Sequence, residues 1–224
     1  MRDVIVLDGP AGSGKSTVSK RLAEALGFRY LDTGSMYRAA TRAVLDAGVD
    51  PSDADAVAET VLGADLQVGT DPRAPTVSVS GRDVTGAIRG PDVTHAVSLV
   101  SAVPQVREHL VAQQRLIMSR GQVVAEGRDL GTTVAPDATL KVYLTASPEA
   151  RARRRAAEHT DELTDEEVAV HAESIARRDH LDSTRASSPM RAASDAVEVD
   201  TSDMTIDQVI AHISDLLQEK RRAG

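Results

Sequence analysis

A glycine-rich segment near the start of the chain, GPAGSGKS at residues 9–16, fits the phosphate-binding pattern G-x-x-x-x-G-K-[ST]. The apolar run 4–7 before it is typical of a buried parallel strand, and the apolar spacing over 17–26 predicts a helix. In this strand–loop–helix context, glycines allow backbone N–H groups to point at phosphate oxygens. The alternative is a glycine-rich turn that merely begins a helix. The predicted loop residues are Gly9, Pro10, Ala11, Gly12, Ser13, Gly14, Lys15, Ser16 and Thr17.

Two side chains of this loop have a specific chemical role in the pattern. Lys15 can reach the β- and γ-phosphates of a nucleotide, and the hydroxyl of Ser16 can bind Mg²⁺. The loop therefore predicts ATP as a ligand, together with Mg²⁺ held by Ser16 and the phosphates. It does not by itself say which reaction follows.

The composition is that of a globular protein and argues against several classes of partner. The chain has 224 residues, of which 41% are hydrophobic, enough for one domain with a sizeable core. Its net charge of −8 argues against a broad nucleic-acid-binding face. The sequence has no cysteine, no histidines at metal-ligand spacing and no apolar stretch of membrane-spanning length. We therefore expect a cytoplasmic protein with small-molecule partners, without nucleic acid or membrane.

The rest of the chain alternates between strand and helix patterns. Further buried strands are predicted at 28–31, 122–126, 140–145 and 196–199, and further helices at 104–119, 164–178 and 205–220. This alternation favours an α/β fold with a parallel sheet that has helices on both faces. One segment departs from it, because 66–84 alternates polar and apolar residues and predicts a small antiparallel β-rich insertion.

Three further motifs narrow the choice of family. They are DTGSMYR at 32–38, EGRD at 126–129, and RRD at 177–179 with Asp182 and Arg185 after the late helix. Together with the P-loop and the insertion, these motifs closely resemble those of bacterial cytidylate (CMP) kinases, which are nucleoside monophosphate kinases of the P-loop type. The P-loop alone is widespread, whereas the combination is far narrower.

The resemblance covers essentially the whole chain and implies both a fold and a reaction. The implied fold is the P-loop nucleoside-monophosphate-kinase fold, with a five-stranded parallel sheet flanked by helices in a single domain over 1–224. It includes a monophosphate-binding region at about 33–100 and a lid at about 148–165. The implied reaction is phosphoryl transfer from ATP to CMP and dCMP, giving ADP and CDP or dCDP, in pyrimidine nucleotide metabolism. The resemblance also suggests a monomer.

Arginines are the residues that the resemblance implies for the phosphates. With Lys15 as a catalytic residue, it implies that Arg38, Arg128 and Arg185 bind the acceptor phosphate and the transferred group. A guanidinium suits this role because it binds phosphate bidentately and stays charged. The acceptor oxygen is already deprotonated, so no general base is expected. The alternative for each arginine is a surface ion pair, such as Arg128 with Asp129.

Recognition of cytosine requires an acceptor and donors placed opposite its edge. By resemblance, Asp129 accepts from the C4 amino group, Arg107 donates to N3 and O2, and Thr33 lies beside the base. Uracil has a carbonyl oxygen at C4, so two hydrogen-bond acceptors, this oxygen and the carboxylate of Asp129, would face each other. A buried site disfavours that arrangement. For Asp129 the alternative is a helix cap or an arginine partner.

The ribose hydroxyls are assigned by resemblance to Ser98, Arg178 and Asp182. Helical serines often bond their own backbone, so Ser98 has the alternative of a helix-face hydroxyl. For Asp182 the alternative is a residue of a loop or a cap.

A cluster of arginines falls in the implied lid. The resemblance implies that these residues close over the ATP phosphates and exclude water. A solvated helix face with charge pairs is the alternative. The residues are Arg151, Arg154 and Arg155.

Other functions stay open at this point. Another P-loop kinase activity, on AMP, UMP or a sugar-like acid, fits the loop. The DTG residues at 32–34 together with the EGRD segment argue against it, and an assay of acceptors separates the two activities. A nucleotide-dependent switch protein is disfavoured because the chain contains no asparagine for a guanine-binding motif. A protein that binds nucleotide without turnover is the remaining alternative, although every expected catalytic position is filled.

Overall fold

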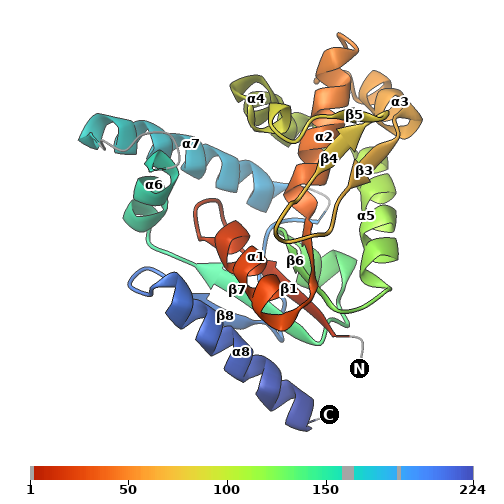
Figure 1. Ribbon diagram of the computed structural model, residues 1–224. Coiled ribbons are helices and arrows are strands. Elements are labelled where there is room, and N and C mark those ends of the chain that lie inside the picture. Colours follow the sequence, from red (N-terminus) through yellow and green to blue (C-terminus); the bar gives the residue numbers. More distant parts are fainter. Residues whose placement is uncertain (1–2, 158–163, 186–187, 224) are drawn as a thin grey trace.

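A five-stranded parallel sheet forms the centre of the computed structural model, which describes residues 3–157, 164–185 and 188–223 (Figure 1). Every neighbouring pair of strands in this sheet is parallel. The strand order is β2 (Arg29–Asp32), β6 (Val123–Glu126), β1 (Val4–Asp8), β7 (Leu140–Thr145) and β8 (Val197–Asp200). The predicted five parallel strands are therefore confirmed, with each end within one residue of its expected place.

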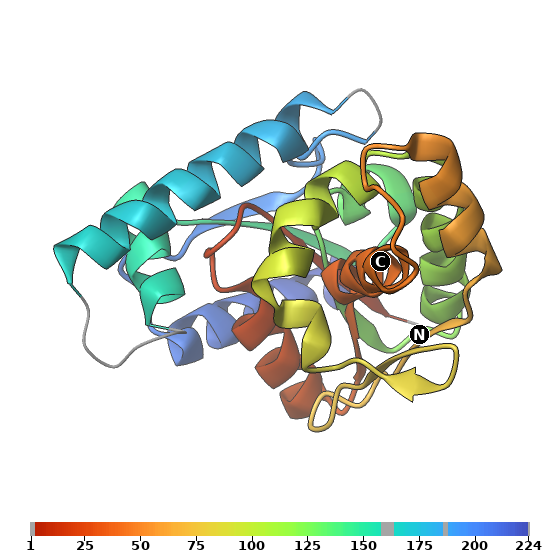
Figure 2. The ribbon, with the colours of Figure 1, turned by 90° about the horizontal axis from the view of Figure 1, so that it is seen from above.

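Helices cover both faces of the sheet, as the alternation of elements predicted (Figure 2). The α-helices are α1 (Lys15–Leu26), α2 (Thr33–Asp46), α3 (Ala54–Gly63), α4 (Pro91–Val100), α5 (Pro104–Met118), α6 (Pro148–Ala156), α7 (Asp165–Thr184) and α8 (Ile206–Ala223). On one face, Leu22 of α1 and Ile213 of α8 share an apolar cluster with strand residues. On the other face, Ala39 of α2 and Leu110 of α5 do the same. The sheet is thus buried on both sides, which is why its strands are continuous apolar runs.

The predicted β-rich insertion is confirmed as a separate three-stranded antiparallel sheet. Its strands are β3 (Leu66–Val68), β4 (Val77–Val79) and β5 (Arg82–Asp83). Val77 and Val79 are buried against the cluster that contains α2, whereas Ser78 between them is only half-buried. The turn from β4 to β5 uses Ser80 and Gly81, both with positive φ. The alternation of side chains thus decides which face of this small sheet packs on the core.

The end of the late helix differs from the sequence-based expectation. We expected a helix to about residue 178, with the RRD segment and Asp182 following it, but α7 continues to Thr184. Asp182 therefore lies within the helix, and its interpretation as a loop residue is wrong. No glycine or proline follows Arg178 before the end of α7, so nothing in the chain stops the helix there.

The implied lid corresponds to α6 and the connection to α7. The expected range, about 148–165, includes residues 158–163, which lie outside the described part of the chain. Within the described residues, α6 packs against α7. No helix among the described residues is both long enough and apolar enough to span a membrane.

Three strands end at the same edge of the sheet and lead into the functional segments. The segment after β1 is the glycine-rich loop, β2 leads directly into α2, and β6 leads into a short π-helical turn, η2 (Leu130–Val134). A 3₁₀ turn, η1 (Ala87–Arg89), precedes α4. In open α/β sheets, ligands bind beyond the carboxyl ends of the strands, and this edge is where the predicted site residues gather.

Candidate active site

A cavity of about 820 Å³ lies at the carboxyl edge of the sheet, between the glycine-rich loop, α2, α4 and α7. It brings together residues that are widely separated in the sequence. The predicted site residues that line it are Ala11, Gly12, Lys15, Ser16, Thr17, Thr33, Arg38, Arg107, Arg128, Asp129, Arg155, Arg178, Asp182 and Arg185. The predicted site residues that are not among its lining residues are Gly9, Pro10, Ser13, Gly14, Ser98, Arg151 and Arg154.

The loop before α1 needs glycine at two positions for steric reasons. Gly9 and Gly12 both have positive φ values, of 145° and 75°. A Cβ atom on Gly9 would lie 2.1 Å from the carbonyl oxygen of Leu144, and one on Gly12 would lie 2.8 Å from that of Arg151. Any other residue would therefore force the loop away from β7 and α6.

Lys15 is folded back onto its own loop. Its Nζ donates to the carbonyl oxygen of Pro10 at 2.6 Å and to the Oγ of Ser13 at 3.4 Å. Burial, together with the nearby guanidinium of Arg128, lowers the pKa of Lys15 to about 7. The ammonium is thus poorly compensated in the free protein, and a phosphate group would stabilise its charged form.

A buried carboxylate, Glu126 at the end of β6, holds the serine of the loop. Ser16 Oγ donates to Glu126 Oε2 at 2.8 Å, and the hydroxyl of Tyr30 donates to Oε1. Thr33 Oγ1 donates to the backbone oxygen of the same residue at 2.7 Å. Burial raises the pKa of Glu126 to about 7, and the neighbouring carboxylate of Asp32 acts in the same direction. Sequence reasoning quoted Glu126 within a motif but gave it no role; its signal is an acidic residue that ends an otherwise apolar strand.

The turn that carries the EGRD segment is fixed by a second buried carboxylate. Asp8, the last residue of β1, accepts from the backbone N–H groups of Leu130 and Gly131 at 2.9 and 2.8 Å. Burial raises its pKa to about 6, although the two N–H groups oppose this shift. Asp8 thereby holds η2, and with it Arg128 and Asp129, against the central strand. Sequence reasoning gave Asp8 no part in the site.

Arg38 on α2 lines the cavity, and hydrogen bonds to two neighbouring residues fix its guanidinium. Its Nη1 donates to the carbonyl oxygen of Ile88 and to the Oγ1 of Thr94, both at 3.1 Å. Burial and the nearby Arg155 lower the pKa of Arg38 to about 10. The guanidinium has no carboxylate partner in the ion pairs of the described residues, so it is set up to receive an anion.

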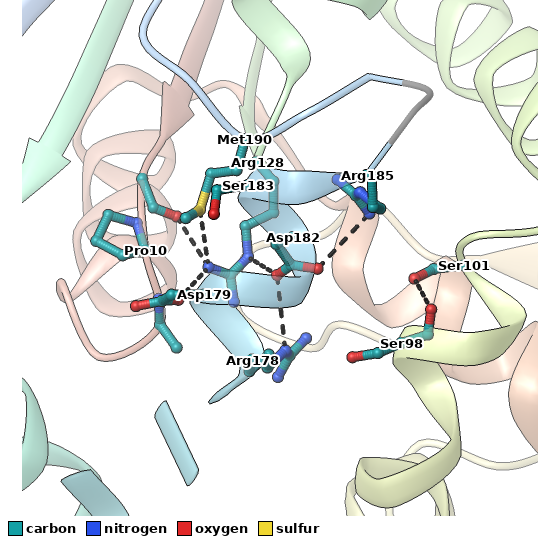
Figure 3. Close-up of polar contacts among 12 residues, drawn as sticks. Pro10, Ser98, Ser101, Arg128, Arg178, Asp179, Asp182, Ser183, Arg185 and Met190 are labelled. Atoms are coloured by element: carbon teal, nitrogen blue, oxygen red, sulfur yellow. Dashed lines mark hydrogen bonds and ion pairs between the residues drawn. The ribbon is translucent and has the colours of Figure 1, made fainter. Parts of the chain in front are cut away.

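Asp182 gathers three arginines at the α7 side of the cavity (Figure 3). Its carboxylate lies 3.3 Å from Arg128 Nε, 3.6 Å from Arg185 Nη1 and 3.9 Å from Arg178 Nε. Burial, with the charge of Arg128, lowers the pKa of Arg178 to about 9. The surface pair of Arg128 with Asp129, which was the alternative to a functional role, is not formed among the described residues, because Arg128 binds Asp179 and Asp182 on α7.

Asp129 is instead paired with Arg107 from α5. Arg107 Nη2 lies 2.5 Å from Asp129 Oδ2, and both side chains are more than nine-tenths buried. The guanidinium also lies over the ring of Tyr37, 5.3 Å from its centre. Burial raises the pKa of Asp129, and Arg107 opposes that shift. Asp129 caps no helix with its side chain, so of the two alternatives only the arginine partner is observed.

Ser98 does not line the cavity, but its neighbour one turn later does. Ser98 uses its carbonyl oxygen to accept from Ser101 Oγ at 3.2 Å, and Ser101 is the one that lines the cavity (Figure 3). Arg107 Nη1 also approaches the carbonyl oxygen of Ser101, at 3.4 Å. Sequence reasoning missed Ser101, since no motif distinguishes the two serines.

The three arginines of α6 have different surroundings. Arg155 lines the cavity. Arg151 donates to the carbonyl oxygen of Ala11 at 3.1 Å, and Arg154 donates to Oγ1 and the carbonyl oxygen of Thr201 at 3.0 and 2.6 Å. Arg151 and Arg154 are therefore bound to neighbouring backbone, and the alternative of a wholly solvated helix face does not hold for them.

The sequence of this chain is similar to one family of known proteins over nearly its whole length. A family model described as cytidylate kinase matches residues 5–219. Over 222 residues the chain is 53% identical to a cytidylate kinase of Rhodococcus opacus, covering 99% of this chain and 97% of that protein. Over 219 residues it is 55% identical to a cytidylate kinase of Mycobacterium avium, covering 97% and 96%. A solved structure of an uncharacterized protein from Eubacterium ventriosum shares the fold alone, with a TM-score of 0.50, 10% identity, and coverage of 96% and 98%.

Proposed function

This chain belongs to the cytidylate kinase family, and on that premise we propose that the central cavity is where ATP phosphorylates CMP and dCMP. The products are ADP and CDP or dCDP. The observation that carries the proposal is that the glycine-rich loop and the buried Arg107–Asp129 pair line one cavity. A donor phosphate chain at the loop and a cytosine at the pair would then meet in the same space.

Phosphoryl transfer requires positioning and charge neutralisation rather than covalent chemistry by the protein. In our proposal Lys15 and the loop bind the donor phosphates, while Arg38, Arg128 and Arg185 bind the acceptor phosphate and the transferred group. The lowered pKa values of Lys15 and Arg38 support this role. They show that burial and neighbouring cations disfavour the positive charge, which a bound phosphate would stabilise. The acceptor oxygen is already ionised, so no general base is needed.

Mg²⁺ is proposed as the accompanying cation, and the residues beside the loop suit it. Ser16 Oγ and the carboxylate of Glu126 supply hard oxygen atoms 2.8 Å apart. No cluster of three or more His, Cys, Asp or Glu side chains in the described chain could hold a metal ion by itself. Such a site fits a cation bound mainly by substrate phosphates and water, which is the usual mode for Mg²⁺. When bound, the ion would neutralise phosphate charge.

Cytosine recognition is proposed for the buried pair. Asp129 would accept from the C4 amino group while Arg107 donates to N3 and O2, with Thr33 beside the base. The burial of both charged side chains supports this, because an unmatched base would leave buried polar groups unpaired. For the ribose we propose Arg178 and Asp182, which line the cavity. Ser98 stays a proposal from the resemblance alone, because Ser101 and not Ser98 lines the cavity.

The remaining features follow from the resemblance and are proposals of the same kind. We propose a single kinase domain with a monophosphate-binding region over about 33–100 and a lid over about 148–165. In it Arg155 would face the ATP phosphates, with Arg151 supporting the glycine-rich loop and Arg154 supporting Thr201, the residue after β8. We also propose a cytoplasmic monomer whose partners are small-molecule substrates.

The decisive experiment compares acceptors under identical conditions. ADP formation from Mg-ATP is measured with CMP, dCMP, UMP, AMP and shikimate at equal concentrations. We expect strong activity with CMP and dCMP and little with the others. Activity confined to another acceptor would keep the kinase fold but overturn the roles of Asp129 and Arg107.

A further inference from the structure

Asp179, on α7, contacts three parts of the molecule that are far apart in the sequence. Its Oδ1 accepts from the backbone N–H of Ala11 in the glycine-rich loop at 3.1 Å and from Arg128 Nη1 at 3.1 Å. Its Oδ2 accepts from Arg151 Nη1 on α6. The separations along the chain are 168, 51 and 28 residues, so this carboxylate joins the loop, the EGRD turn and the lid helix.

Both arginines that bind Asp179 also contact the backbone of the glycine-rich loop. Arg151 Nη1 donates to the carbonyl oxygen of Ala11 at 3.1 Å, and Arg128 Nη1 lies 3.4 Å from that of Gly9. The three charged side chains are 13–16% exposed, so water competes weakly for these bonds. The result is a connected, largely buried network that fixes two arginines against the loop.

Asp179 itself does not line the cavity, whereas Arg128 does. Figure 3 shows Arg128 between the carboxylates of Asp179 and Asp182. Asp179 accepts a hydrogen bond from its Nη1 at 3.1 Å, and Asp182 lies 3.3 Å from its Nε. A guanidinium held at two of its nitrogens has a fixed plane, and its third nitrogen can meet a phosphate without rotamer loss.

We propose that Asp179 is a positioning residue that fixes Arg128 and the lid arginine Arg151 relative to the glycine-rich loop. The proposal rests on the proposed role of Arg128 in phosphoryl transfer and adds the group that orients it. Asp179 binds the backbone of the loop and both arginines at once. A single carboxylate would therefore hold the residues proposed for the donor phosphates and those proposed for the acceptor phosphate in fixed relative positions. A displacement of about 1 Å in such a group can reduce turnover about 100-fold.

The test is a double-mutant cycle between Asp179 and Arg128 in the full-length protein, with kcat and KM measured for Mg-ATP and CMP. Asp179→Ala is expected to lower kcat by at least about 10-fold, with smaller changes in KM, because the lost orientation matters most in the transition state. In the Arg128→Ala background, the same substitution should cost several-fold less than in the wild type, since one of the two arginines that it orients is gone and only Arg151 and the loop remain. Equal losses in both backgrounds would overturn the proposal.

Matched variants separate positioning from general destabilisation. His180→Ala changes the next residue, which is exposed, and should leave kcat and the melting temperature unchanged. Asp179→Asn keeps an acceptor for the Ala11 N–H but loses the charge, so its kcat should lie between those of wild type and Asp179→Ala. If Asp179→Ala does not fold, the cycle is run with Asp179→Asn, and additivity there overturns the proposal equally.

Failure of the proposed function would look different. A near-normal kcat in Arg128→Ala alone would remove Arg128 from the reaction, whatever Asp179 does. A large loss in Arg128→Ala with additive behaviour of Asp179 would leave the proposed function intact and reject only its positioning by Asp179.

Discussion

The phosphate side of the cavity and its base side differ in how well their buried charges are compensated. On the phosphate side, Lys15 and Arg38 have pKa values lowered by burial and by neighbouring cations. On the base side, Arg107 and Asp129 neutralise each other at 2.5 Å. One side therefore carries excess positive charge that a ligand would neutralise, while the other is already compensated before any ligand binds.

This difference predicts different consequences of mutation on the two sides. Removing a cation from the phosphate side relieves repulsion, so activity should suffer while stability does not. Removing one member of the base-side pair leaves an uncompensated buried charge, which costs about 3–5 kcal/mol of stability. The substitutions below test whether activity and stability separate in this way.

The largest expected effect is on the phosphate side, at Lys15. Lys15→Ala should lower kcat by about 1,000-fold or more, because the donor phosphates lose their principal cation. The free energy of unfolding should stay the same or rise, since the charged form of this buried lysine is disfavoured in the free protein. Steady-state kinetics and urea denaturation measure the two quantities. A near-normal kcat would contradict the assignment of the loop, and a loss of stability would contradict the comparison.

On the base side, Asp129→Ala should affect both quantities. We expect kcat/KM for CMP to fall about 100-fold, because the C4 amino group and Arg107 both lose their acceptor. Stability should fall by about 3–5 kcal/mol. The matched control is the double variant Arg107→Met/Asp129→Leu, which should regain most of the stability but none of the activity. If kcat/KM for CMP is unchanged in Asp129→Ala, the carboxylate does not recognise the base.

Local patterns explain why much of the fold could be predicted from the sequence. The glycine-rich loop lies between a strand and a helix whose apolar spacing is visible over a few residues, and the five buried strands are continuous apolar runs. The motifs follow the ends of β1, β2 and β6, so a parallel sheet necessarily brings them to one edge. These residues met as expected because strand direction alone decides where they lie.

What sequence could not give are contacts between side chains set by the packing of distant elements. Ser16 meets Glu126 across 110 residues, and Asp179 meets Ala11 across 168. No periodicity encodes such pairs, since they depend on how α1 packs against β6 and on how α7 lies over the loop. The helical state of Asp182 was missed for a more local reason, because a charged segment without glycine or proline gives no signal of whether a helix continues.

An intermediate effect is expected at Asp182, which lies between the two sides. Its carboxylate binds Arg128, Arg178 and Arg185, so Asp182→Ala should lower turnover with both CMP and dCMP. If it also binds a ribose hydroxyl, the ratio of kcat/KM for CMP to that for dCMP should fall about 10-fold, because only CMP has the 2′-hydroxyl to lose. The ratio is measured with both acceptors in parallel. An unchanged ratio with reduced turnover would leave Asp182 as an ion-pair partner only.

The smallest expected effect is the uptake of at most one proton when Mg-ATP binds at pH 8. In the free protein the pKa of Lys15 is lowered to about 7, so at pH 8 the amine is mostly neutral. Bound phosphates favour its charged form and raise that pKa, so the protein takes up a proton between the two values. Burial also raises the pKa of Glu126, but the Mg²⁺ proposed beside it would favour its ionised form and oppose proton uptake there. Calorimetric titrations in buffers of different ionisation enthalpy measure the uptake. It should be absent in Lys15→Ala, and an equal uptake in that variant would place the titrating group elsewhere and remove Lys15 from the charge imbalance proposed for the phosphate side.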